Sequence, residues 1–247
     1  MTFMRTENRN NITALKTGYY SSILLVCVTF ITFAVAMTAI PKSGPFCPGN
    51  CIDYPYLDSL KFYPGDYYWM YLAIVQICIW MIFMVSIYFI TPPGKEIFGL
   101  ISISFMLASS IILLADYFVQ LMVIPISLMK GETEGIAMLT QYNDHGVFIA
   151  LEELGYLLMS ISLLFLAFVF HRGNKLERAI RITFLLPFIL SIISMSFFSL
   201  KFGIDRSYRF EIAVITINWL ALIVVSILSG LFLHKKIRLS NEKTIIN

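Results

Sequence analysis

Six long apolar segments dominate the pattern of hydrophobic and polar positions along this chain of 247 residues. They cover residues 19–40, 68–90, 97–125, 147–170, 182–200 and 211–233. Each has roughly the 20 residues that a helix needs to cross the hydrocarbon core of a bilayer. Turn formers and charged residues separate them, as at Pro92, Pro93 and Gly94. The pattern predicts an all-α, polytopic transmembrane helix bundle with six spans.

The same pattern divides the chain into one transmembrane domain and two short tails. Residues 1–18 form the predicted N-terminal tail, residues 19–233 the six-helix domain, and residues 234–247 a basic C-terminal tail. Residues 41–67 form a long loop that we expect on the outer face of the membrane. The segments between the spans leave no room for a soluble domain.

Composition excludes a water-soluble globule. Apolar residues make up 58% of the chain, charged residues only 13%, and the mean hydropathy is +0.80. Soluble domains contain about 25% charged residues, and disordered chains are poor in apolar residues. The net charge of +3 is too small to indicate nucleic-acid binding. The predicted environment is therefore the lipid bilayer.

The basic residues predict the orientation of the bundle. Twelve of the eighteen Lys and Arg residues lie on one side: Arg5, Arg9, Lys16, Lys95, Arg172, Lys175, Arg178, Arg181, Lys235, Lys236, Arg238 and Lys243. The other side has six: Lys42, Lys61, Lys130, Lys201, Arg206 and Arg209. Because cytoplasmic loops carry the excess of positive charge, both termini are predicted to be cytoplasmic.

The first apolar segment also permits a different interpretation. A basic N-terminal region, an apolar stretch and the small residues Ala34 and Ala36 resemble a secretory signal and its cleavage site. Cleavage at Ala36 would leave five spans. The apolar stretch continues through Ile40, however, and is long enough to span the membrane uncleaved, so six spans are favoured.

The four cysteines fall into two groups. Cys27 and Cys78 lie within apolar spans, where free cysteine usually packs in the core as a small hydrophobic residue. Cys47 and Cys51 flank a Pro-Gly turn in the predicted outer loop, and we expect them to form a disulfide there. The aromatic residues that follow, among them Tyr67 and Trp69, are typical of an interfacial belt.

Polar residues within the spans are the candidate ligand-binding residues, because burying them in hydrocarbon is costly. Asp116 and Gln120 share a helix face, as do Glu152 and Tyr156. Measured from the predicted outer helix ends, the polar positions lie within about 13 Å of that side, in the outer half of the bilayer. The full set is Gln76, Asp116, Gln120, Glu152, Glu153, Tyr156, Glu211, Asn218 and, in a loop above them, His145.

Three roles are open to these residues. They could serve only helix association through hydrogen bonds, line a polar cavity open to the outside, or act as an acid and a base. The chain lacks the nucleophile, metalloprotease and phosphate-binding motifs and the paired histidines of haem-binding bundles. No catalytic residue, metal site or cofactor is therefore predicted.

Three stretches resemble a known group of proteins. They are Ala115, Asp116 and Tyr117, then residues 139–146 (LTQYNDHG), and residues 150–156 (ALEELGY). Together they resemble segments of small prokaryotic six-span membrane proteins of unknown function, over residues 97–170. The resemblance implies a stand-alone inner-membrane protein of a prokaryote. It implies no catalytic residues, because the group has no assigned activity.

The sequence supports three functional hypotheses. The first is a protein that binds or transports a small cationic or amphiphilic molecule in the outer-half cavity, since buried acids favour a cation. The second is a non-catalytic membrane subunit or sensor accessory, whose protein partner the sequence does not identify. The third is an intramembrane enzyme that uses carboxylates on a lipid-like substrate. Nucleic acid is not an expected partner of any of them.

Overall fold

Six long helices form the bundle in the computed structural model, which describes residues 2–171 and 173–246. Arg172, one of the basic residues counted above, lies outside the described residues. All six helices are long and apolar enough to cross a membrane, and the described residues contain no strand. The all-α bundle with six spans is thus confirmed. The helices are α1 (Thr2–Ala36), α2 (Tyr68–Phe89), α3 (Glu96–Met122), α6 (Val147–Ala167), α7 (Lys175–Phe202) and α8 (Ser207–Ile246).

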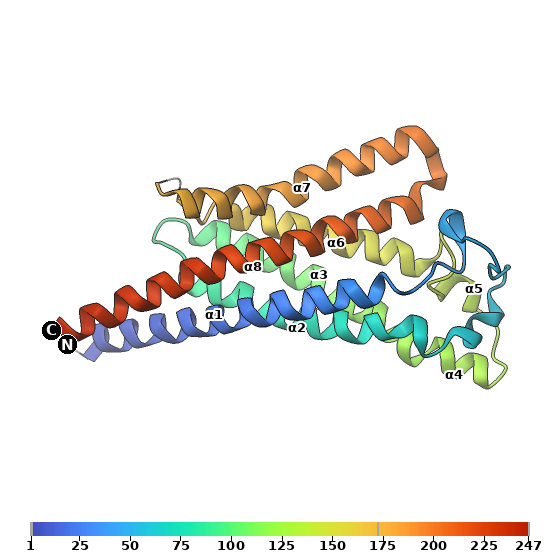
Figure 1. Ribbon diagram of the computed structural model, residues 1–247, viewed down its shortest axis with the longest axis horizontal. Helices are drawn as coiled ribbons and strands as arrows, with labels where there is room; N and C mark the ends of the chain where they lie inside the picture. The colour runs from blue at the N-terminus through green and yellow to red at the C-terminus, as the bar shows by residue number, and fades with distance from the viewer. Residues whose placement is uncertain (1, 172, 247) are drawn as a thin grey trace.

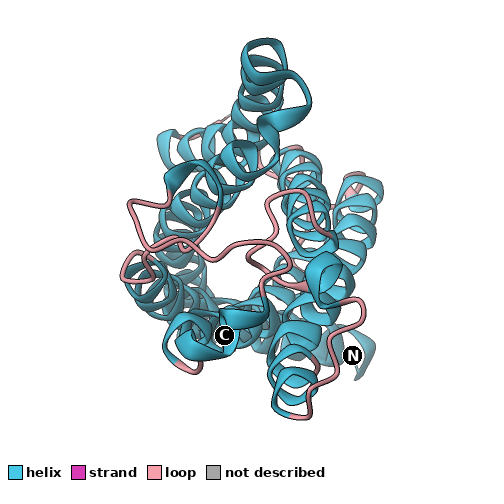
Figure 2. Cartoon of the chain, turned by 90° about the vertical axis from the view of Figure 1, so that its right-hand side faces the viewer, coloured by secondary structure: helices cyan, strands magenta, loops and turns pink. Residues whose placement is uncertain are grey.

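The short elements gather at one end of the bundle, which we call the loop end. The long loop after α1 contains three 3₁₀ turns, η1 (Gly44–Phe46), η2 (Leu57–Phe62) and η3 (Gly65–Tyr67). The helices α4 (Ile124–Met129) and α5 (Ile136–Leu139) lie between α3 and α6, and η4 (Gly203–Arg206) joins α7 to α8. Both chain termini lie at the opposite end (Figure 1). Viewed along the bundle, the loops cross over the helix ends (Figure 2).

The helix bounds differ from the apolar segments in a systematic way. Helix α1 begins at Thr2 and α8 continues to Ile246, so the two predicted tails are largely helical. Lys, Arg and Glu are good helix formers, and a helix therefore continues past the end of its apolar part. The third segment, in contrast, is divided. Helix α3 ends at Met122, and Pro125 lies in the first turn of α4, where its missing N–H costs no hydrogen bond.

Small residues allow the central helices to approach closely. Helix α3 packs along α6, and α1 packs along both α2 and α8. At the first contact Gly155 faces Leu113, and the Ser109 hydroxyl donates to the Gly155 carbonyl oxygen at 2.7 Å. At the α1–α8 contact Gly230 faces Ser22. Small-residue contacts of this kind are typical of helices that associate within a bilayer.

Cysteines 27 and 78 correct one expectation from the sequence. We expected both in the core, but both side chains are exposed on the bundle surface. In a spanning helix that surface contacts lipid, and lipid accommodates a thiol as readily as a protein core does. An apolar span therefore does not reveal which of its faces is buried. Helix α1 itself contributes Leu25 to the core, so cleavage at Ala36 would remove part of the core.

Candidate functional site

A cavity of about 380 Å³ opens between the helix ends at the loop end of the bundle. Its volume falls within the range of small-molecule sites. Aromatic rings form much of its wall, and three charged side chains reach it. The aromatic residues are Phe33, Phe46, Trp69, Tyr142, Phe148, Tyr208 and Trp219, and the charged residues are Lys42, Asp66 and Glu211. The cavity is therefore an aromatic chamber with an excess of one negative charge when all three are ionised.

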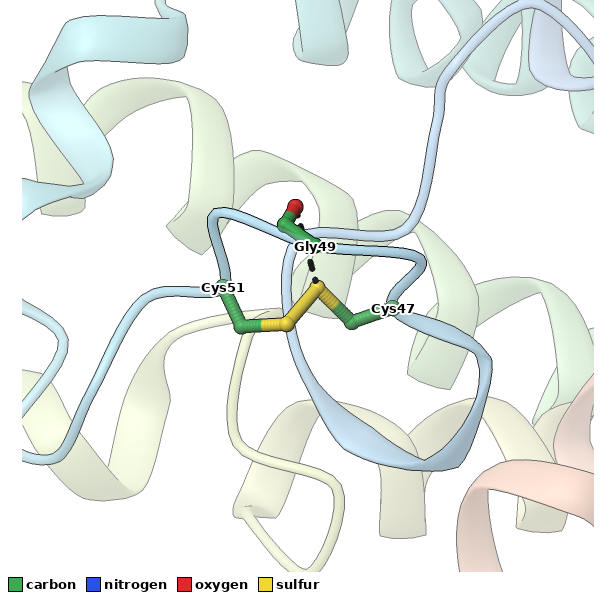
Figure 3. Close-up of a disulfide and its surroundings, with 3 residues drawn as sticks. All are labelled: Cys47, Gly49 and Cys51. Carbon is green, nitrogen blue, oxygen red and sulfur yellow. Dashed lines mark hydrogen bonds between the residues drawn. A yellow bond between two sulfur atoms is a disulfide. The ribbon is translucent and has the colours of Figure 1, made fainter.

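The loop after α1 closes one side of the cavity. The turn at Gly44 has a φ of 67°, a left-handed conformation that glycine adopts without strain, and it brings Phe46 against Tyr208 at 6.0 Å between ring centroids. Just after it, Cys47 and Cys51 form the expected disulfide (Figure 3). This bridge closes a loop of only a few residues, so it shapes the turn beside Phe46 rather than joining distant elements.

A second loop, residues 139–145, also contributes to the cavity wall, through Gln141 and Tyr142. Gln120 on α3 holds it, because its side-chain amide donates to the Leu139 carbonyl oxygen and accepts from the Gln141 N–H at 3.0 Å. The next residue, Tyr142, donates to Asp66 Oδ2 at 3.1 Å. Burial raises the pKa of the Tyr142 hydroxyl, so this donor keeps its proton across the physiological range. The loop between α3 and α6 thus helps to cover the cavity.

Glu211 is the buried acid that reaches the cavity. Its side chain lines the wall, the residue is only 7% exposed, and its Oε2 atom has no hydrogen-bond donor among the described residues. Behind it, the carboxyl group of Glu152 lies within hydrogen-bonding reach. A buried carboxyl group is costly without a donor, a proton or a cation. The chemistry of Glu211 therefore calls for a positive partner.

A chain of hydrogen bonds continues from Glu152 into the bundle. The Tyr117 hydroxyl lies 2.7 Å from Glu152 Oε1 and donates to it. The hydroxyls of Tyr117 and Tyr156 are 2.9 Å apart, and Trp219 Nε1 donates to the Tyr156 hydroxyl at 2.9 Å. Since Trp219 also lines the cavity, the network begins and ends at the cavity wall.

The remaining candidate residues lie outside the cavity lining. Glu153 forms an ion pair with Arg206 of η4 at 3.1 Å. The Asn218 amide donates to the carbonyl oxygens of Tyr156 and Val214. His145 is exposed and contacts Asp144, so it does not reach the cavity.

Asp116 and Gln76 are buried without a specific role in this network. Asp116 accepts no hydrogen bond from the described residues, and its Oδ2 atom is unpaired. Gln76 Oε1 is likewise buried and unpaired. Of the nine candidate residues, Glu211 lines the cavity, while Glu152 and Tyr156 stand directly behind it.

Sequence reasoning missed the aromatic wall. The sequence pattern predicts Tyr67 and Trp69 in an interfacial belt, but Tyr67 is buried and Trp69 lines the cavity, 5.4 Å from the ring of Tyr117. Tyr117 was also missed, although it directly follows Asp116 in the sequence. In an apolar span an aromatic residue gives no polar signal, so only the packing of the helices reveals its neighbours. Among the described residues, no three His, Cys, Asp or Glu side chains are grouped so that they could hold a metal ion.

No family model, curated protein or solved structure matches the chain. The family resemblance of residues 97–170 therefore stays a prediction, and the functional argument depends on the cavity alone.

Proposed function

We propose that this protein binds a small organic cation with apolar substituents in the cavity at the loop end. The observation that carries the proposal is the carboxyl group of Glu211, which is buried in an aromatic wall with one oxygen unpaired. A cation would supply the missing positive partner, and its apolar substituents would contact the rings. A metal ion would instead need several oxygen or nitrogen ligands around one point.

The aromatic wall favours an organic cation over a bare ion. Trp69 and Trp219 lie 6.2 Å apart between ring centroids, and Phe33 lies 6.1 Å from Trp219. The face of an aromatic ring attracts a cation, most strongly for Trp and when water is excluded. Such rings are the usual recognition elements for quaternary ammonium groups. This cavity combines them with a carboxyl group, which supplies most of the charge selectivity.

Two probes of the same shape, one charged and one neutral, test the proposal. Hexyltrimethylammonium should quench or shift the fluorescence of Trp69 and Trp219 in purified Trp80→Phe protein, while the neutral hydrocarbon of the same shape should bind much more weakly. Glu211→Gln keeps the shape of the side chain and removes its charge. We expect this change to weaken binding of the cation by at least about tenfold, which corresponds to about 1.4 kcal/mol.

The control for this experiment is Glu134→Gln. It makes the same chemical change in an exposed loop residue that does not line the cavity, and it should leave the affinity unchanged. Equal binding of the cation to the Glu211→Gln and unaltered proteins would contradict the proposal, as would equal affinity for the charged and neutral probes. The enzyme and subunit hypotheses stay open, and no particular contact favours either.

We further propose that the cavity opens to the outside of the cell and that both termini are cytoplasmic in the inner membrane. The support is the excess of basic residues in the tails and in the loops that share their end of the bundle.

Orientation can be measured by thiol labelling of intact cells. In a Cys27→Ser/Cys78→Ser background, a membrane-impermeant maleimide should label Cys47 and Cys51 after mild reduction, without lysis. Gly173→Cys in the same background, with Cys47 and Cys51 also replaced by Ser, is the matched control, because residue 173 lies in the loop between α6 and α7. That thiol should react only after lysis, and the reverse pattern would place the cavity on the cytoplasmic side.

A further inference from the structure

The carboxyl groups of Glu152 and Glu211 form a buried pair at the back of the cavity. They come from different helices, α6 and α8, and lie within hydrogen-bonding reach of one another. Glu152 is fully buried and Glu211 is 93% buried, given its exposure of 7%. A carboxylate has only acceptors, so a hydrogen bond between two carboxyl groups requires a proton on one of them. Without a bound cation, two buried carboxyl groups at this range are expected to share one proton.

The hydrogen bonds around the pair determine which carboxyl oxygens can share the proton. Tyr117 donates to Glu152 Oε1, which leaves Glu152 Oε2 without a donor from the described residues. Trp219 donates to Tyr156, and Tyr156 in turn can donate to Tyr117, so every donor in this chain is directed toward Glu152. Glu152 is thereby held as the acceptor. A donated hydrogen bond stabilises the charged form of a carboxyl group, so we assign the shared proton to Glu211, at the edge of the cavity.

We propose that the organic cation displaces this proton, so that the protein exchanges one cation for one proton at the Glu152–Glu211 pair. This inference rests on the proposed function and specifies how the site is regulated. In the exchange the O–H bond of Glu211 breaks and the proton leaves through the cavity. The pair changes from one negative charge to two, and the cation restores the original net charge. The buried site thus carries the same net charge, one negative charge, in both states.

Other titratable groups surround the pair on every side. Within the bundle these are Asp116 and Tyr117 of α3, and Glu153 and Tyr156 of α6. On the cavity side they are Tyr208, Asp66 and Lys42. Glu153 already has its own cation in Arg206. Asp116 touches neither member of the pair by a hydrogen bond, so it adds negative potential but takes no part in the exchange.

Calorimetry of the purified protein measures the exchange directly. Hexyltrimethylammonium would be titrated into the protein at one pH, in several buffers that differ in their ionisation enthalpy. The slope of the observed binding heat against the buffer ionisation enthalpy gives the number of protons released. We expect about one proton per bound cation near neutral pH. By linkage, release of one proton makes binding tighter as the pH rises, by about tenfold per pH unit while the free pair holds its proton.

Two variants separate this exchange from a general effect of charge. In Glu152→Gln the amide can donate to Glu211 and still accept from Tyr117, so Glu211 needs no proton. We expect this variant to bind the cation with no proton release and no pH dependence. Glu153→Gln makes the same change at the neighbouring residue and should still release about one proton.

Each outcome bears on a different claim. Binding without proton release in the unaltered protein would overturn the exchange but leave the proposed function standing. Release that persists in Glu152→Gln, or that disappears in Glu153→Gln, would also overturn the assignment to this pair. A cation that does not bind at all would overturn the proposed function, and the exchange with it. Melting temperatures of the three proteins confirm that each is folded.

Discussion

Replacing Gly155 with alanine is expected to destabilise the bundle by about 1–3 kcal/mol, the usual cost of overpacking a core. A Cβ atom at this position would lie 2.5 Å from Leu113 Cδ2 and 2.6 Å from Leu113 Cγ. Leu113 is fully buried, so its side chain has little room to move. Alanine favours helix over glycine, but that gain of about 1 kcal/mol is smaller than the expected steric cost. Valine at the same position should cost more.

Unfolding in a denaturing detergent series would measure this effect. Gly173→Ala is the control, because a Cβ at that loop position would contact nothing within 4 Å. A second test combines Gly155→Ala with Leu113→Ala, where the removed leucine atoms make room for the new methyl group. The double variant should then be more stable than the sum of the two single effects predicts. A neutral Gly155→Ala, or strict additivity, would contradict the close contact of α3 and α6.

Replacing Asp116 with leucine is expected to stabilise the protein, by about 1–3 kcal/mol. A buried polar group without a partner costs about that much, and leucine has a similar shape with no polar atom. From the sequence alone, Asp116 could bond to Gln120 or Tyr117, and its loss would then weaken helix packing. In the structure Gln120 holds the loop at Leu139, and Tyr117 donates to Glu152. Asp116 is left without either partner.

Glu152→Leu is the matched comparison for Asp116→Leu. Both are buried acids on neighbouring helices, but Glu152 accepts the Tyr117 hydrogen bond, and its loss should destabilise the protein. Opposite signs in the two variants are therefore expected in the same unfolding assay. Loss of stability in Asp116→Leu would show that this carboxyl group has a stabilising partner, and the description of Asp116 as unpaired would be wrong.

Hydropathy determines the environment and the number of spans because both depend on the sum of many apolar residues. Errors of a few residues at any boundary do not change that sum. The same averaging explains why hydropathy predicts neither the helix ends nor the buried face of each helix. Helix ends at Thr2 and Ile246 lie in polar sequence that is compatible with helix, and Cys27 and Cys78 lie on helix faces that hydropathy does not distinguish.

The amino-acid sequence alone predicts a six-helix membrane protein, acids buried in one half of the bundle, and a disulfide between Cys47 and Cys51. These properties depend on local composition and on spacing within one segment. Which acids meet depends instead on how the helices pack together. Glu152 and Glu211 are on separate helices, and no spacing within either helix predicts their contact. The sequence also does not predict that Trp69 and Trp219 form the cavity wall in front of these two acids. The rotation of each helix about its axis is set by its packing against the other helices.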